Sequence, residues 1–228
     1  MSTREPFLAG ATRWVLLAIT AASALVAAWG IAQVPAGHPI PIHWNAAGEA
    51  DGFGSRWWLL TGPGMVLLTT GLAVLVARVE PRQANIAASY GPLRAFAVVM
   101  AGFGFLLTLA MALSAAGNPI DVGAWISVGV GLLIAAIGTL LGRIRSNYMF
   151  GVRTPWTLAS DLSWQRTHRI IGFMWVVVGL ATAALGLAGL PEASIWVLLG
   201  GLMLSLVVAF WYSYVVWRDD PDKEPTGR

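Results

Sequence analysis

Long apolar stretches alternate with short polar ones along this chain, and six of the apolar stretches are long enough to cross a membrane. A helix needs roughly 20 residues to cross a hydrocarbon core about 30 Å thick. The six predicted spans are Arg13–Gln33, Trp57–Val79, Leu93–Ala116, Val122–Leu141, Ile170–Leu190 and Ser194–Trp217. The pattern therefore predicts an all-α integral membrane protein, built as a bundle of about six transmembrane helices.

The connections between the predicted spans differ in length and polarity. The third and fifth are short and contain Pro119 and Pro191, which is typical of tight helical hairpins. The first, residues 34–56, is rich in proline and glycine and predicts a compact extended loop with turns. The fourth, residues 143–169, is the longest polar interruption. Because hydrocarbon satisfies no hydrogen bond, its polar groups must face water, headgroups or a packed interior.

The composition agrees with a membrane protein. The chain is 57% hydrophobic and only 11% charged, whereas a soluble domain carries roughly 25% charged residues. It has no cysteine, which excludes disulfides, thiolate nucleophiles and cysteine-ligated metals. No stretch resembles a nucleic-acid-binding face. We therefore expect the lipid bilayer as a partner, and neither nucleic acid nor a cofactor.

The basic residues predict the orientation of the bundle. All of the 14 Lys and Arg residues except Arg56 fall in the two tails, which include Arg4 and Arg228, or in the second and fourth connections. Cytoplasmic loops carry an excess of Lys and Arg. We therefore expect both termini in the cytoplasm, with residues 218–228 forming a disordered tail.

Within residues 143–169, one motif carries a resemblance to a known family. The motif reads Asn147-Tyr148-x-x-Gly151-x-Arg153-Thr154-Pro155-Trp156-Thr157, followed by Trp164 and His168. It resembles the signature of the SdpI family, bacterial multispan membrane proteins whose namesake gives immunity to a secreted peptide toxin. The resemblance implies a multi-pass protein of the bacterial cytoplasmic (inner) membrane. It also makes these residues a candidate site, either for binding a partner or for the structure.

A second motif lies in the first connection. Pro-Ile-His-Trp-Asn-x-x-Gly-x-x-Asp-Gly resembles a short domain of unknown function that often precedes the SdpI signature. Its candidate site residues are His43, Asn45, Gly48 and Asp51. The order of the two motifs divides the chain into an N-terminal two-helix unit, residues 1–92, and a four-helix SdpI-like unit, residues 93–217.

Arg153 is the most informative single residue of the SdpI-like motif. Gly151 and Pro155 bracket it in a loop that needs unusual backbone angles, so its position is expected to be fixed. Arginine can hold a carboxylate or a lipid phosphate through two parallel hydrogen bonds. The competing interpretation, to which we give somewhat more weight, is that Arg153 pairs with Asp161 or with helix carbonyls inside the protein.

The residues that follow predict a short amphipathic helix. Ser160 is a plausible N-cap and Asp161 a first-turn acid, while Trp164, His168 and Ile171 fall on one face. We expect this helix to lie at the inner headgroup layer and to run into the fifth span. His168 is expected to anchor the helix rather than to shuttle protons, although its usual pKa permits either role.

The first connection also offers potential metal ligands. His38 and His43 with Glu49 and Asp51 could bind zinc, because imidazole and carboxylate are normal zinc ligands. No strong ligand motif is present. Hydrogen bonds from His43, Asn45 and Asp51 that fold the loop are therefore favoured, and no metal site is assigned.

The residues argue against an enzyme, and the resemblance to the SdpI family makes a binding or protection protein the leading hypothesis. No catalytic triad order or phosphate-binding glycine loop is suggested, and no acidic residue is predicted in mid-membrane, where ion-coupled transport usually needs one. The family resemblance implies recognition of a secreted, membrane-active peptide toxin and sequestration of a cytoplasmic transcriptional repressor. A small-molecule or lipid transporter is the alternative, and a membrane hydrolase that uses the outer His, Asp and Glu residues is a third possibility.

Overall fold

Six long helices dominate the computed structural model, which describes residues 7–8 and 10–226. They are α1 (Ala11–Gln33), α2 (Thr61–Val79), α4 (Tyr90–Ala115), α5 (Val122–Leu141), α7 (Asp161–Leu187) and α8 (Pro191–Arg218). The short elements are β1 (Ile40–Trp44), β2 (Ala50–Gly54), the 3-10 helix η1 (Arg56–Leu60), α3 (Gln83–Ala88) and α6 (Pro155–Leu158). Among the described residues, six helices are long and apolar enough to cross a membrane, which confirms the predicted set of spans.

Side-chain caps explain where two of the long helices begin. The Asp121 carboxylate accepts a hydrogen bond from the Ala124 N–H at 2.9 Å and starts α5. The Ser160 hydroxyl accepts one from the Ser163 N–H at 2.8 Å and starts α7. The predicted amphipathic helix and the predicted fifth span are therefore one continuous helix, which begins at Asp161.

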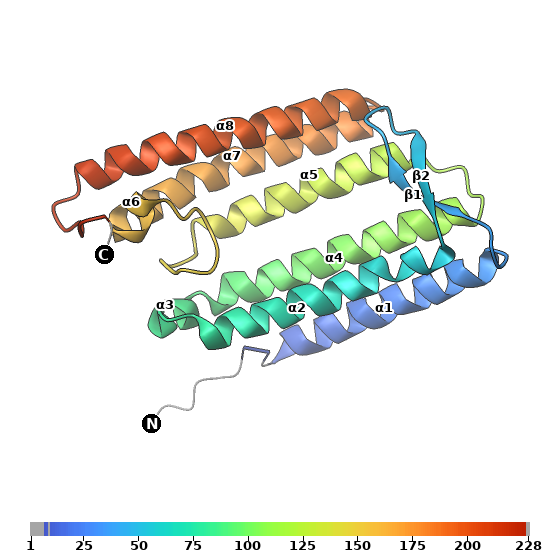
Figure 1. Cartoon of the computed structure of the whole chain (residues 1–228), viewed down its shortest axis with the longest axis horizontal. Helices are drawn as coiled ribbons and strands as arrows, with labels where there is room; N and C mark the ends of the chain where they lie inside the picture. Colours follow the sequence, from blue (N-terminus) through green and yellow to red (C-terminus); the bar gives the residue numbers. More distant parts are fainter. Residues whose placement is uncertain (1–6, 9, 227–228) are drawn as a thin grey trace.

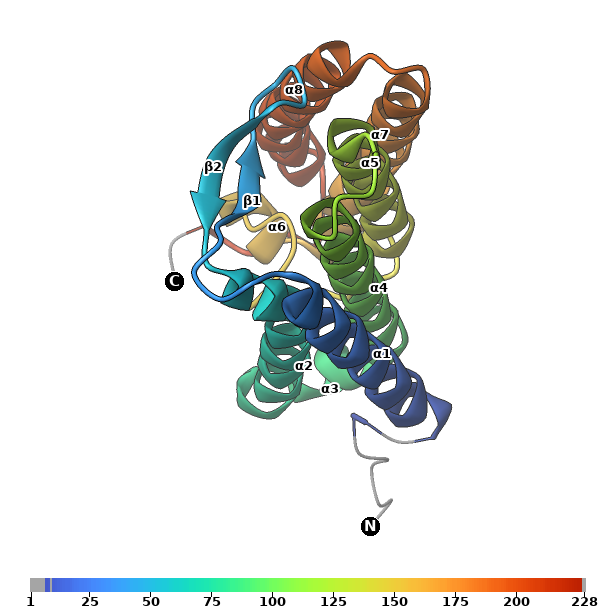
Figure 2. The same cartoon turned by 90° about the vertical axis from the view of Figure 1, so that its right-hand side faces the viewer.

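The long helices form two groups of three (Figure 1). α1, α2 and α4 pack together, α5, α7 and α8 pack together, and α4 packs against α5 to join the groups. The turned view shows α8 and α2 on the same side of the molecule but well apart (Figure 2). In space α4 thus packs with α1 and α2. The predicted division of the chain into two units after residue 92 stays a prediction.

Glycines allow α5 and α7 to approach closely. A Cβ added at Gly138 would lie 2.6 Å from the carbonyl oxygen of Gly172, and one added at Gly131 would lie 2.6 Å from that of Gly179. Small residues at such crossings let membrane helices gain van der Waals contact. Gly142, four residues after Gly138, has no atom nearer than 3.6 Å to its added Cβ, so its contact is an ordinary one.

A β-hairpin covers one end of the bundle, where the sequence predicted an extended loop. β1 and β2 pair in antiparallel fashion, and the turn between them packs on the group of α5, α7 and α8. A Cβ added at Gly123 would lie only 2.7 Å from the Cα of Gly48. Arg56 lies at this end and donates from Nη1 to the Val34 carbonyl at 2.7 Å, just after α1. This bond gives Arg56 a structural role at the end of α1.

The opposite end of the bundle carries α3, α6 and the described ends of the chain (Figure 1). The second and fourth connections, with most of the basic residues, lie at this end as well. Arg4 and Arg228 of the predicted charge pattern lie outside the described residues.

Replacing Gly138 with alanine tests the close packing of α5 on α7. The added methyl group would also lie 2.9 Å from the Val176 nitrogen, so backbone must move. We expect a loss of about 1–3 kcal/mol in the free energy of unfolding, as for other overpacked sites, measured by denaturant titration in detergent micelles. Gly102→Ala on α4 is the control, because nothing lies within 4 Å of its added Cβ. Equal stabilities of the two variants would contradict this packing.

Candidate functional site

A cluster of buried polar groups, here called the inner junction, lies at the end of the bundle opposite the hairpin. It comprises residues 143–160 and the polar side chains that contact them from the α2–α3 connection, from Ser89 between α3 and α4, and from α7 and α8. Members that are at most 1% exposed are Glu80, Ser89, Asn147, Thr157, Ser163, His168 and Ser213. Polar groups buried in a membrane protein require internal hydrogen-bond partners, and the inner junction supplies them.

The Asn147 side chain forms hydrogen bonds with three backbone groups in the first part of the junction. Its Oδ1 accepts hydrogen bonds from the N–H groups of Met149 and Phe150, each at 2.9 Å. Its Nδ2 donates to the carbonyl of Arg145 at 2.9 Å. A short amide side chain that bonds nearby backbone in this way replaces the hydrogen bonds of regular structure. The predicted site residue Asn147 is therefore the organiser of a turn.

Trp164 and His168 hold the loop from the side of α7. The Trp164 Nε1–H donates to the Ile144 carbonyl at 2.8 Å, and the two rings stack with centroids 4.1 Å apart. The His168 Nε2 accepts from the Val152 N–H at 2.9 Å, and its Nδ1 donates to the Trp164 carbonyl at 2.8 Å. These bonds assign the neutral Nδ1–H tautomer. The face predicted to meet headgroups is instead buried against the loop.

Gly151 is required where the loop crosses these two rings. Its φ is 103°, which L side chains rarely adopt, and an added Cβ would lie 2.5 Å from the His168 Nε2 and 3.3 Å from the Trp164 ring. Glycine is therefore needed at this position of the motif for two reasons: the backbone has a positive φ, and no side chain fits beside the stacked rings of Trp164 and His168.

Thr154, Pro155 and Thr157 start the short helix α6. The Thr154 hydroxyl accepts from the Thr157 N–H, and the Thr157 hydroxyl accepts from the Thr154 N–H, with Pro155 at the first helical position. Thr154 also donates to the Ser213 hydroxyl on α8 at 2.9 Å. The motif therefore attaches α6 to the last transmembrane helix.

Trp156 strengthens the same attachment. Its ring meets Phe210 and Tyr214 of α8 edge-to-face, with centroid distances of 4.7 Å and 5.2 Å. Trp156 therefore supports the position of the loop rather than presenting a free ring.

Glu80 and Arg82, between α2 and α3, connect the other helix group to the loop. Buried Glu80 accepts from the Tyr148 N–H at 3.2 Å and from the Arg82 N–H at 3.0 Å. The Arg82 guanidinium donates to the hydroxyls of Ser146 and Tyr148 and lies over the Tyr148 ring. Sequence reasoning missed both residues. The sequence signal that could have identified Glu80 is a carboxylate next to Pro81, directly after a predicted span.

Arg153 is an exposed residue on the rim of the junction. Its Nη1 donates to the Tyr148 carbonyl at 2.7 Å. The ion pairs among the described residues are His43–Asp51 and Arg218–Asp219, so Arg153 has no carboxylate partner there. The expected pairing with Asp161 is therefore not present, and the carbonyl that Arg153 binds belongs to the loop rather than to a helix.

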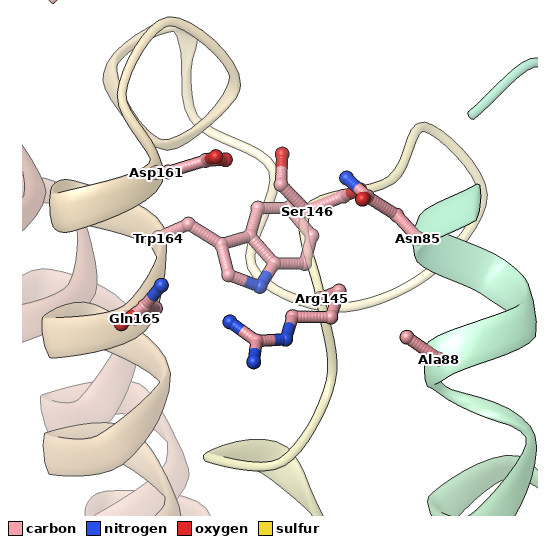
Figure 3. A pocket seen from close by; sticks show the side chains of 7 residues that line it. All are labelled: Asn85, Ala88, Arg145, Ser146, Asp161, Trp164 and Gln165. Carbon is pink, nitrogen blue, oxygen red and sulfur yellow. The ribbon is translucent and has the colours of Figure 1, made fainter.

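A small polar pocket of about 150 Å³ opens beside Trp164 (Figure 3). Asp161 and Gln165 line it from α7, Arg145 and Ser146 from the loop, and Asn85 from α3. The Asn85 Nδ2 donates to the Ser146 carbonyl at 2.8 Å. Charged groups of both signs thus meet at the surface of the inner junction.

The chain after α8 returns to the junction. The Ser160 hydroxyl donates to the Asp220 carboxylate at 2.5 Å, and the Glu224 N–H donates to the Ala159 carbonyl at 2.8 Å. The hydrogen bond from Ser160 holds the pKa of the Asp220 carboxyl below its usual range. Disorder of the whole segment 218–228 stays a prediction, because residues 227 and 228 lie outside the described part of the chain.

The outer candidate residues lie together in the hairpin, far from the inner junction. The His43 Nδ1 and the Asp51 carboxylate are 2.5 Å apart. The Asn45 Oδ1 accepts from the N–H groups of Ala47 and Glu49, and Gly48 has a φ of 85°. Within the part of the chain that the structure describes, no three His, Asp or Glu residues are placed to hold a metal ion.

Six apolar helices, closed at one end by a buried polar junction, define a multi-pass helical membrane protein. Residues 143–213 match the SdpI/YfhL protein family, and residues 18–67 match a domain of unknown function, DUF1648. The resemblance to the SdpI family, with that domain ahead of the signature, is therefore confirmed. The first region contains the inner junction loop, and the second contains the hairpin.

A curated relative agrees with this assignment. Immunity protein SdpI of Bacillus subtilis (strain 168) is 27% identical to this chain over 114 residues. The match covers 50% of this chain and 55% of that protein, so the chain spans about half the length of its relative. No solved structure is significantly similar to the chain.

Replacing Gly151 with alanine tests the role of this glycine. Left-handed backbone strain costs about 1–3 kcal/mol, and the clash with His168 adds to it. Gly37→Ala is the control, because Gly37 has a φ of 82° but nothing within 4 Å of its added Cβ. We expect Gly151→Ala to lower the free energy of unfolding more than Gly37→Ala does. A smaller loss at residue 151 would contradict the contact with the stacked rings.

The Ser160–Asp220 bond predicts a pH dependence. Because folding lowers the pKa of Asp220, its contribution to stability is complete above the usual aspartate pKa of about 3.9 and is lost as the pH falls through the lowered value. We expect wild type to unfold at a higher temperature than Asp220→Asn at pH 7, and this difference to shrink in acid. Ser160→Ala, which removes the donor, should reduce the pH-dependent part of the difference. A difference that persists unchanged in acid would disprove the linkage.

Proposed function

We propose that this protein is an SdpI-like immunity protein that protects a bacterial cell against a secreted, membrane-active peptide toxin. The observation that carries the proposal is the match of residues 143–213 to the SdpI/YfhL family, because these residues build the inner junction. Similarity to the immunity protein of B. subtilis supports the same function. Membership of a family named for immunity also suggests a non-enzymatic role.

The proposed location is the bacterial cytoplasmic membrane, with the inner junction and both termini in the cytoplasm. The support is the distribution of charge. Arg82, Arg94, Arg143 and Arg145 lie within a few residues of the ends of α2, α4 and α5 that adjoin the junction, and cytoplasmic loops are enriched in such residues. The hairpin then faces outward, toward a secreted peptide.

In this proposal the toxin first meets the hairpin end. Phe53, Trp57 and Trp58 are 59%, 58% and 52% exposed there. Aromatic side chains suit the membrane–water interface, and a membrane-active peptide is amphipathic enough to lie in the same layer. Phe53 lies in the same hairpin as His43 and Asn45, and Trp57 and Trp58 follow it on η1. The inner junction would respond at the other end of the bundle.

A cytoplasmic partner would bind at the inner junction. We propose a transcriptional repressor, held at the membrane when the toxin is bound. The pocket beside Trp164 offers Arg145, Asp161 and Gln165 at the surface (Figure 3). These side chains can pair with charged or amide groups of a protein surface.

A transporter would need a polar path from Arg153 to the outer loop. The cavity that begins at Arg153 is lined mainly by apolar side chains, and its lining residues reach from the junction only to about the middle of the helices. No observation on the described residues therefore favours transport over immunity.

Replacing Arg153 tests the proposal. A sensitive bacterium that expresses Arg153→Gln should survive a panel of secreted peptide toxins less well than one that expresses wild type, by about tenfold or more, because a charged hydrogen bond is worth about 1.5–3 kcal/mol. Membrane levels are measured in parallel. Arg143→Gln, an exposed arginine just after α5, should protect like wild type. Full protection by a stably inserted Arg153→Gln would remove the residue from the site, and failure of wild type against every toxin would remove the proposed function.

A further inference from the structure

An apolar groove of about 850 Å³ lies between the two helix groups. Its walls come from α2 and α4 on one side and from α5, α7 and α8 on the other, for example Leu72, Phe96, Ile137 and Leu206. No substantial packing joins α2 to α8 in the described part of the chain, so the groove is open along that side. Its volume is that of a ligand site, about 300–1,000 Å³.

The groove has the depth of one membrane leaflet. It extends from the loop at Gly151 to Thr69 on α2 and Ser205 on α8. Thr69 lies about ten residues before the end of α2 at Val79, which is about 15 Å along a helix. That length is half of a hydrocarbon core about 30 Å thick. An acyl chain of the leaflet on the junction side therefore fits the groove in both length and polarity.

The mouth of the groove carries a cation. Arg153 and Thr154 line it where the loop meets the helix ends. Only Nη1 of Arg153 has a hydrogen bond, to the Tyr148 carbonyl, and no carboxylate pairs with the guanidinium among the described residues. Its planar fork can hold a phosphate through further N–H groups. Because no carboxylate among the described residues neutralises Arg153, its positive charge favours a lipid with net negative charge.

The geometry points to a lipid site: the groove takes one acyl chain of an anionic glycerophospholipid, and Arg153 binds its phosphate. The headgroup lies at the rim of the inner junction, and the chain follows α2 and α8 toward the middle of the bilayer. The site is separate from the hairpin end, and lipid binding to it does not require a toxin.

Native mass spectrometry of delipidated full-length protein tests the site. The probes are dioleoylphosphatidylglycerol and dioleoylphosphatidylcholine, which share their chains and differ in net charge. Wild type should bind one phosphatidylglycerol about tenfold more tightly than phosphatidylcholine, and Arg153→Gln should remove most of this preference. Arg143→Gln should keep it.

A second pair of variants tests the groove itself. Leu72 lines the groove and is 50% exposed, whereas Leu75 on the same helix is 51% exposed and lies outside the lining. Leu72→Trp should weaken the binding of both lipids about equally, and Leu75→Trp should leave it unchanged. Melting temperatures in detergent confirm that each variant is folded.

Several results would overturn the site. Equal binding of the two lipids by wild type, or equal effects of Arg153→Gln and Arg143→Gln, would exclude specific recognition of an anionic headgroup. Equal effects of Leu72→Trp and Leu75→Trp would show that the acyl chain of the lipid does not lie in the groove. A second copy of the protein, or a co-purified peptide, that excludes lipid would assign the groove to a protein partner.

Discussion

A polar group buried inside a protein must find its hydrogen-bond partner there, and this constraint explains how the loop at the basic end of the bundle is built. Its backbone between Arg143 and Thr154, ahead of the short helix α6, has no helix or sheet to satisfy it, so side chains do so. Asn147 binds three backbone groups, and His168 and Trp164 each bind one more. Removing any of these partners would leave a backbone group of the junction without its hydrogen bond, which costs about 1–3 kcal/mol for a buried group.

The same segment holds the two helix groups together. α4 and α5 provide the direct packing, while Glu80 and Arg82 reach from one group to Tyr148 and Ser146 in the loop. The hairpin turn bridges the groups at the other end through the contact of Gly48 with Gly123. The bundle is thus fixed at both ends, which allows an apolar groove to remain between α2 and α8 without loss of the fold.

The six spans could be predicted because each is a run of apolar residues long enough to cross a membrane. A helix is the structure in which such a run satisfies its own backbone hydrogen bonds. The hydrogen-bond partners of the side chains in the junction could not be predicted from apolar length. Trp164 and His168 share a helix face, as predicted, but a lone sequence cannot tell a face that meets headgroups from one that meets another loop. Glu80 and Arg82 were missed because their partners lie more than sixty residues away.

Sequence alone determined the fold class, the number of spans and the chemistry available at each end, since apolar length and local caps depend on neighbouring residues. It also identified Gly151 as a position with a special backbone demand. Only the tertiary structure decided that Arg153 has no carboxylate partner among residues 7–8 and 10–226, that Trp156 packs on α8, and that a groove opens between the helix groups. These features depend on how distant helices pack, and packing is set by contacts that no local pattern contains.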